Sequence, residues 1–195
     1  MFHTPIFLDV ETNGKGTFRP PKQRVIQMGW IVGDTFRNYY VKGCAHISSG
    51  AFMVHGITVE HLDQHGYDYK EVLDALITDI KGVENPIIVA HNCAFDIGCM
   101  LHTLELEQLE HATGVFVATL QQFCTMQKGT DVCQLPGLHG YNGYKYPKLS
   151  ELCQHMEVSC AGMKQHDALQ DAMMLKCAFE KGVRSNQFSL RMQCE

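Results

Sequence analysis

The chain has 195 residues, of which 45% are hydrophobic and 19% charged, a composition typical of one folded domain with a buried core. The net charge of −5 argues against a protein that holds long stretches of nucleic acid, because such proteins are normally basic. No run approaches the roughly 20 apolar residues of a membrane span, so we expect no membrane partner. The nine cysteines form no C-x-x-C pair, which indicates reduced thiols.

Three apolar runs open the chain and predict the first strands of a sheet, at 6–11, 24–32 and 36–42. Gly33 and Asp34 lie between the second and third runs and predict a tight hairpin. These strands are therefore expected to be antiparallel neighbours.

The middle of the chain alternates helical and strand patterns. The segment 49–58 is expected to be a loop, and its last residue, Thr58, to cap a short helix. One apolar face over 69–82 predicts an amphipathic helix. The wholly apolar run within 85–92 predicts a buried central strand, and a further helix is expected over 94–107.

The last third of the chain predicts a strand at 114–119, followed by a loop rich in Gly, Pro and Tyr at 135–147. Two helices are expected after it, over 148–156 and 166–182, with Gly182 closing the second.

Hairpin strands followed by alternating helices and strands predict an α/β fold. We expect a mixed sheet, with three leading antiparallel strands and then parallel strands, and helices on both faces. Residues 1–182 are expected to form a single domain and residues 183–195 a short C-terminal tail.

Carboxylates lie where three of these elements begin or end. Asp9 and Glu11 are two residues apart in the first strand, so their side chains point to the same side of the sheet. Asp96 lies in the first turn of a helix, and Asp171 lies one turn into the last helix. Taken alone, the strand pair fits a frayed strand end and Asp96 an acid favoured by the helix dipole. Asp167 alone fits an N-terminal cap, and His166 an exposed loop residue. Acids that converge near a core would repel one another unless cations lay between them.

Four carboxylates and one histidine are the groups that two-metal phosphodiester hydrolysis requires. Two divalent ions about 4 Å apart bind the attacking and leaving oxygens, and Mg²⁺ keeps waters and takes few protein ligands. Histidine side chains in general have a pKa near 6.5 and can accept a proton from the attacking water at neutral pH. His166 is the candidate for this role. Geometry alone leaves Asp167 and Asp171 as rivals for the fourth acid, because they lie four residues apart on one helix.

The order of three motifs resembles that of the DEDDh group of 3′–5′ exonucleases, which includes DnaQ-like proofreading subunits of bacterial and phage type, exonuclease X and RNase T. The motifs are DVET at 9–12, HNCAFD at 91–96 and HDALQD at 166–171. The resemblance covers about residues 5–182 and implies a ribonuclease H-like fold. It also implies two Mg²⁺ ions as cofactors, with Mn²⁺ able to substitute.

The resemblance assigns roles to individual residues. It implies four metal-binding carboxylates, Asp9, Glu11, Asp96 and Asp171. It implies that His166 is the general base, and the family spacing H-x4-D selects Asp171 over Asp167. The substrate contacts that it implies are Thr12, Asn13, Val54, His55, Asn92 and Phe95. Asn13 departs from many members, which carry Thr before the glycine.

The activity implied is the release of nucleoside monophosphates from 3′ ends of DNA, single-stranded or frayed, for proofreading or degradation. The expected location is the cytosol of a bacterium or of an infected host cell. Trimming of RNA 3′ ends stays open as an alternative, because one contact to a 2′-hydroxyl can decide between the sugars. A non-catalytic end-binding protein or a polymerase-complex module is the alternative of another class. The sequence leaves the oligomeric state open.

Two further segments leave alternatives open. The region 141–148 mixes tyrosines with lysines, which fits the stacking of a single strand or a loop folded over the next helix. The tail sequence QFSLRM resembles peptides that dock on bacterial sliding clamps, with Gln187, Leu190 and Met192 as anchors. The alternative is a C-terminal strap in which Phe188 and Leu190 pack on the domain.

Overall fold

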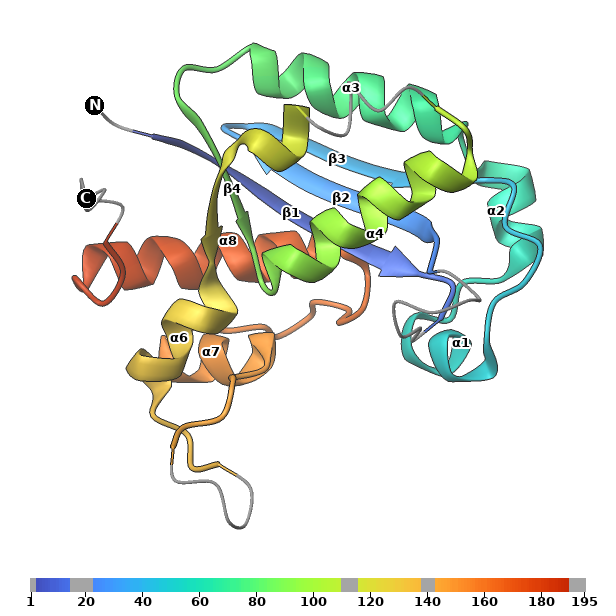
Figure 1. The fold of residues 1–195 in the computed structure, drawn as a ribbon. Helices are drawn as coiled ribbons and strands as arrows, with labels where there is room; N and C mark the ends of the chain where they lie inside the picture. The colour runs from blue at the N-terminus through green and yellow to red at the C-terminus, as the bar shows by residue number, and fades with distance from the viewer. Residues whose placement is uncertain (1–2, 15–22, 110–115, 138–142, 190–195) are drawn as a thin grey trace.

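The structure is a computed structural model of the chain that describes residues 3–14, 23–109, 116–137 and 143–189 (Figure 1). Leu190 and Met192, the expected apolar anchors of a docking peptide, lie outside the described residues. Within the described ranges, no helix has the length and apolar character needed to cross a membrane.

A mixed five-stranded sheet forms the centre of the fold, in the order β3-β2-β1-β4-β5 (Figure 1). Its strands are β1 (Thr4–Thr12), β2 (Val25–Val32), β3 (Thr35–Tyr40), β4 (Pro86–Ala90) and β5 (Gln121–Cys124). The strands β1, β2 and β3 pair antiparallel, whereas β4 pairs parallel with β1 and β5 parallel with β4. This topology confirms the predicted mixed sheet.

Helices cover both faces of the sheet, which confirms the predicted layers (Figure 1). One face is covered by α3 (Tyr69–Lys81) and α4 (Cys93–Leu106), and the other by α6 (Thr125–Cys133), α7 (Leu149–His155) and α8 (Ala168–Arg184). Two short helices, α1 (Ser49–His55) and α2 (Val59–His65), lie at the end of the sheet toward which β1 runs. Every residue of β2 is buried as a result.

The alternation of β1 decides on which side its acids lie. Ile6 and Leu8 belong to the apolar cluster under α3 and α4. Phe7 belongs to the cluster under α7 and α8. Asp9 and Glu11 share the parity of Phe7, so the strand directs both toward the α8 side of the sheet.

Two local predictions are wrong. The expected loop at 49–58 contains α1, which begins with the Ser48 hydroxyl accepting the Ala51 N–H and ends at Gly56 in the left-handed region, at φ 74°. Described residues of the expected strand at 114–119 are helical instead, and the strand β5 follows at 121–124. In both segments the pattern was too short to separate a helical turn from extended chain.

The other local predictions differ from the structure mainly at element ends. Thr58 caps α2 as expected, because its hydroxyl accepts the His61 N–H at 3.1 Å. The helix α6 was not predicted. The helix α8 continues past Gly182 to Arg184.

Gly182 gives space to the C-terminal segment. A Cβ on Gly182 would lie 2.4 Å from Cδ2 of Phe188, a separation that packed atoms do not reach. Phe188 is buried and its ring lies 5.4 Å from that of Phe123 and 6.2 Å from that of Phe179. Phe188 therefore belongs to the core, as the strap interpretation expects, whereas Gln187 is exposed.

The start of α8 lies directly on β2. A Cβ on Gly29 would lie 2.3 Å from the backbone carbon of Ala168 and from the backbone nitrogen of Leu169, so only glycine admits this approach. The neighbouring Gln27 fastens the same turn, because its Oε1 accepts the Ala168 N–H at 3.3 Å and its Nε2 donates to Asp167 Oδ2 at 2.9 Å. The position of α8 on the sheet is thus fixed by β2.

We predict that Gly29→Ala lowers the melting temperature, because the added methyl group must push the backbone of α8 off the sheet. Overpacking of this kind costs about 1–3 kcal/mol or more. Differential scanning calorimetry measures the effect. The matched control is Gly98→Ala in α4, where a Cβ meets nothing within 4 Å and should leave stability equal or higher. Equal melting temperatures for Gly29→Ala and the unmodified chain would contradict this packing.

Candidate active site

Asp9 and Glu11 occupy a part of β1 that has a neighbour on one edge only. On the β2 edge, Asp9 pairs with Gly29 and Glu11 with Gln27. On the other edge, the pairing with β4 ends at Phe7. The two acids therefore lie where β1 extends beyond β4, at the carboxyl end of both strands, where open α/β sheets carry their binding crevices.

Asp96 reaches this projecting part of β1 from α4. The helix begins after Asn92, and Asp96 lies in its first turn, 3% exposed. Its carboxylate accepts the backbone N–H of Val10, which β4 does not cover. The contact joins the start of α4 to β1 and brings Asp96 beside Asp9.

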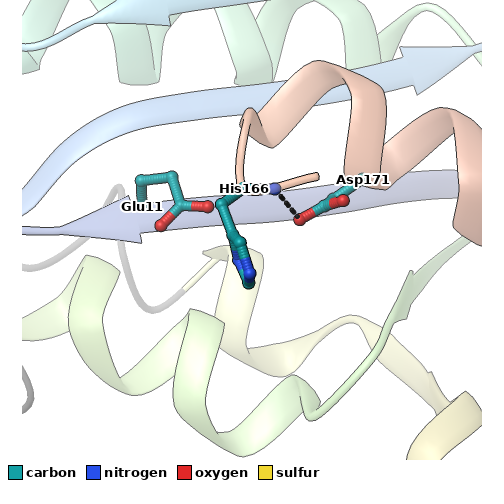
Figure 2. A group of neighbouring side chains, drawn as sticks. All are labelled: Glu11, His166 and Asp171. Carbon is teal, nitrogen blue, oxygen red and sulfur yellow. Dashed lines mark hydrogen bonds between the residues drawn. The ribbon is translucent and has the colours of Figure 1, made fainter. Parts of the chain in front are cut away.

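The start of α8 supplies the third group of side chains. Asp167 caps the helix, because its Oδ1 accepts the Gln170 N–H at 3.2 Å. Asp171 Oδ2 accepts the backbone N–H of His166 at 3.0 Å, and this bond holds His166 in the left-handed region at φ 63° (Figure 2). One ligand atom from each of Glu11, His166 and Asp171 lies within 4.8 Å of the others, a grouping that could hold a metal ion.

The negative charges of these acids are electrostatically unfavourable in the absence of a bound cation. Burial raises the pKa of Glu11 to about 7, the negative charges of Asp171 and Asp167 raise it as well, and Lys164 opposes them. Burial also raises the pKa of Asp171, against the opposing hydrogen bond from His166. Side chains that resist losing their protons are expected where carboxylates gather without a cation.

Asp9 and Asp96 follow the same pattern. Burial raises the pKa of Asp9 well above its ordinary range, and the charges of Asp96, Asp171 and Glu11 raise it further. Burial likewise raises the pKa of Asp96, although two backbone N–H groups oppose this change. A set of carboxylate oxygens with this excess of negative charge fits hard divalent cations, which would remove the repulsion.

A cavity of about 540 Å³ opens over this group of acids. Its walls come from β1, α1, the first turn of α4 and the starts of α7 and α8. It contains Glu11, His166 and Asp171 of the expected catalytic residues, and Thr12, Val54, His55 and Phe95 of the expected substrate contacts. Glu11 and Asp171 thus line a cavity that a ligand of moderate size can enter, whereas Asp9 and Asp96 are not among its lining residues.

The four expected substrate contacts in the wall differ in character. Val54 and Phe95 are 36% and 37% exposed, so they present apolar surface to the cavity. His55 is buried, its Nδ1 accepts the Ile57 N–H at 2.9 Å, and burial lowers its pKa, which favours the neutral ring. The Thr12 hydroxyl is engaged with the Gly14 carbonyl at 3.0 Å.

Asn13 and Asn92, the other two expected substrate contacts, do not line the cavity. Asn13 joins two loops, because its Oδ1 accepts the Arg24 N–H at 2.8 Å and its Nδ2 donates to the His46 carbonyl at 3.2 Å. Asn92 adopts the left-handed conformation from which α4 begins. In the structure, Asn13 holds two loops together and Asn92 forms the turn before α4. Their contact with substrate stays a prediction.

Sequence reasoning missed several residues of this site. Lys148, Ser150 and Gln165 line the cavity without any assigned role. Lys148 belongs to the region in which lysines and tyrosines alternate, so that pattern did carry a signal. Gln27 positions α8 and was also missed, although a glutamine in the otherwise apolar strand VIQMGWIV was the clue. An ion pair between Lys145 and Glu151 fixes the loop before α7 to that helix.

The chain is similar to known proteins over most of its length. The family model RNase_T, described as an exonuclease, matches residues 6–179. The chain is 28% identical over 179 residues to DNA polymerase III subunit epsilon of Buchnera aphidicola, covering 87% of this chain and 68% of that protein. It is 29% identical over 181 residues to the Escherichia coli epsilon subunit, covering 87% of this chain and 67% of that protein.

Solved structures share the fold over nearly the whole chain. Escherichia coli exonuclease I in complex with a dT13 oligonucleotide matches with a TM-score of 0.70 and 18% identity, over 95% of this chain and 42% of that one. Exonuclease I of Methylocaldum szegediense matches with a TM-score of 0.70 and 18% identity, over 95% and 41%. The chain spans about two fifths of the exonuclease I chains, and the likeness establishes the ribonuclease H-like fold.

Without added divalent metal, the melting temperature should fall as the pH rises from about 5 to 8. Folded Glu11 has a pKa of about 7, above its ordinary value near 4.5, so between these values the folded state binds more protons than the unfolded state. The stability that this proton contributes is present at low pH and is lost as the pH rises through the folded pKa. Each pH unit between the two pKa values changes the free energy of unfolding by at most about 1.4 kcal/mol. Thermal scans across this pH range measure the slope.

Glu11→Gln removes one of the titrating groups and should make this slope shallower. The control Glu84→Gln changes an exposed acid in a turn and should leave the slope as it is. Added Mg²⁺ should raise the melting temperature at pH 8 more than at pH 5. A melting temperature that rises from pH 5 to 8 without metal, and does so equally in Glu11→Gln, would overturn the electrostatic account.

Proposed function

Because the chain belongs to the RNase_T exonuclease family, we propose that it hydrolyses DNA from the 3′ end and releases nucleoside monophosphates. The observation that carries this proposal is the convergence of Glu11, His166 and Asp171 in the wall of one cavity, with Asp9 and Asp96 close enough to raise the energy of the charged acids. These are the five residues for which the motif order implies catalytic roles.

We propose that two Mg²⁺ ions occupy the site, held by the four carboxylates. When bound, the ions would supply positive charge to the phosphate that is attacked and to the leaving oxygen. The donor set is made of oxygen atoms, which suits Mg²⁺ or Mn²⁺. One exonuclease I structure is described as a zinc-bound form, so the shared fold admits divalent ions in that protein.

His166 is proposed as the general base. Its residue is exposed and precedes the helix, while its backbone N–H is fixed by Asp171. This arrangement holds the residue in place and leaves the imidazole at the cavity wall, where it can take the proton of an attacking water. Asp171 therefore has two proposed tasks, as metal ligand and as the acceptor that positions His166.

The cavity favours a strand end over a duplex. Val54 and Phe95 offer apolar surface against which one base can pack, and the volume of about 540 Å³ is that of a small-molecule site. The net charge of −5 also disfavours extended backbone binding. Single-stranded or frayed 3′ ends are therefore the proposed substrate, and the exonuclease I complexes with dT13 and dA16 support DNA as its class.

A polymerase complex is the proposed protein partner, because both epsilon relatives are named as subunits of DNA polymerase III. Docking on a clamp through Gln187, Leu190 and Met192 stays a prediction of the sequence. Gln187 is exposed, and the other two anchors lie outside the described residues.

Asp171→Asn should reduce the hydrolysis rate at least about 100-fold in Mg²⁺, because the neutral amide supplies less charge to the metal and a weaker acceptor to His166. Asp167→Asn is the matched control on the same turn. Asparagine caps a helix as well as aspartate, so this variant should stay within about tenfold of the unmodified chain. An inactive Asp167→Asn beside an active Asp171→Asn would reverse the assignment.

Matched oligonucleotides test the substrate. A 5′-labelled DNA strand in Mg²⁺ should give a ladder that shortens by single nucleotides, and a circular DNA single strand should resist. A ladder on RNA alone would assign the enzyme to RNA ends. Binding of the DNA end with no cleavage in Mg²⁺ or Mn²⁺ would instead identify a non-catalytic end-binding protein.

A further inference from the structure

Two thiols outside the acid cluster lie together where β5 meets α4. Cys124 is the last residue of β5, and Cys93 is the first residue of α4. Cys124 pairs across the sheet with Ala90, three residues before Cys93. The two thiols lie in the same apolar cluster and interact with each other, and the Cys93 thiol also donates to the Ala90 carbonyl at 3.8 Å. The proposed hydrolysis uses neither of them.

Backbone amides surround the sulfur of Cys124. It accepts N–H groups from Asn92, Cys93 and Gln127. Asn92 is left-handed at φ 98° and Cys93 is helical, and consecutive residues in these conformations turn adjacent amides toward one anion. The Gln127 amide comes from the first turn of α6, where free N–H groups carry partial positive charge. The surroundings of this sulfur therefore favour a thiolate.

The pKa values of the two thiols shift in opposite directions. The Cys93 thiol and the surrounding amides lower the pKa of Cys124 to about 5, whereas the interaction with Cys124 and burial raise the pKa of Cys93. A thiolate beside a protonated thiol is the pairing found at oxidation-sensitive cysteines with a resolving partner.

Cys133 and Cys99 each lack one of these properties. Cys133, at the end of α6, is partly exposed like Cys124, but burial raises its pKa. Cys99, in α4, is buried and its pKa is raised to about 12. Cys124 is partly exposed, and its surroundings stabilise its thiolate. A small oxidant can therefore reach its sulfur in the reactive, deprotonated form.

We propose that Cys124 and Cys93 form a reversible oxidation site for hydroperoxides. The Cys124 thiolate attacks one oxygen of hydrogen peroxide, the O–O bond breaks, and a sulfenic acid and hydroxide form. The sulfur of Cys93 then attacks the sulfenic sulfur, the S–O bond breaks, and the oxygen leaves as water with the thiol proton. Two electrons pass from the two thiols to one peroxide, and a dithiol reductant reverses the change.

Formation of the disulfide would act on the acid cluster through α4. A disulfide requires a sulfur separation of about 2.05 Å, much shorter than that of hydrogen-bonded sulfurs. Closing this distance pulls the first turn of α4 toward β5. Asp96 lies in that turn and is bonded to Val10, so its carboxylate would shift relative to β1. The oxidised chain is therefore expected to lose hydrolytic activity, a consequence that rests on the proposed function.

The chemical test is independent of hydrolysis. The full reduced chain is treated with hydrogen peroxide, and the products are followed by intact mass and peptide mapping. We expect the loss of two hydrogens and a peptide linked through Cys93 and Cys124. Cys93→Ser should stop at a sulfenic acid that dimedone traps on Cys124. A map that pairs only other cysteines, such as Cys153 with Cys160, would overturn the proposal.

Matched variants separate the site from general thiol reactivity. Cys124→Ser should slow the oxidation at least tenfold, whereas Cys133→Ser should react as the unmodified chain does. In the unmodified chain, iodoacetamide at pH 6 should label Cys124 at least tenfold faster than Cys133, which needs no variant to fold. Equal labelling rates would contradict the proposal. If the chain cleaves DNA, peroxide should inhibit it reversibly in Cys133→Ser and not in Cys124→Ser.

Discussion

The contact between α8 and β2 is the constraint on which the site depends. At Gly29 the backbone of α8 comes so close to the sheet that no side chain fits between them. Gln27, two residues away along β2, accepts the backbone N–H of Ala168 at the start of the helix, a buried amide that has no partner within the helix. Because β2 is in register with β1, the same pair of residues lies opposite Asp9 and Glu11. The close approach therefore brings Asp171 and His166 to the acids of β1, without a flexible loop between them.

The same packing creates an electrostatic cost. Asp9, Glu11, Asp96 and Asp171 are held near one another at the edge of two apolar clusters, and burial raises the pKa of each. Such an arrangement is unfavourable for folding alone and is offset by the apolar packing on both faces of the sheet. A bound divalent cation would turn the electrostatic free energy of these carboxylates from unfavourable to favourable. The repulsion that weakens the metal-free fold would therefore strengthen metal binding.

Local periodicity accounts for what the sequence could predict. The side shared by Asp9 and Glu11 follows from the two-residue repeat of a strand, and the mixed sheet follows from the order of strand and helix patterns. The helix at 49–55 was missed because its pattern is short and its stability comes from tertiary packing of residues such as Ala51. The strand at 121–124 was missed because its edge position leaves both glutamines exposed. Lys148 and Gln165 come to line one cavity only when the chain folds.

The first turn of α4 connects the two kinds of chemistry in this fold. It begins where β4 ends, and because β1 continues beyond β4, Asp96 can reach the uncovered amide of Val10. The left-handed Asn92 that starts the turn also directs two amides toward the sulfur of Cys124. One short segment thus holds a carboxylate of the acid cluster on one side and the thiol pair on the other. Any force that moves this turn acts on both, because a helix start held by hydrogen bonds moves as a unit.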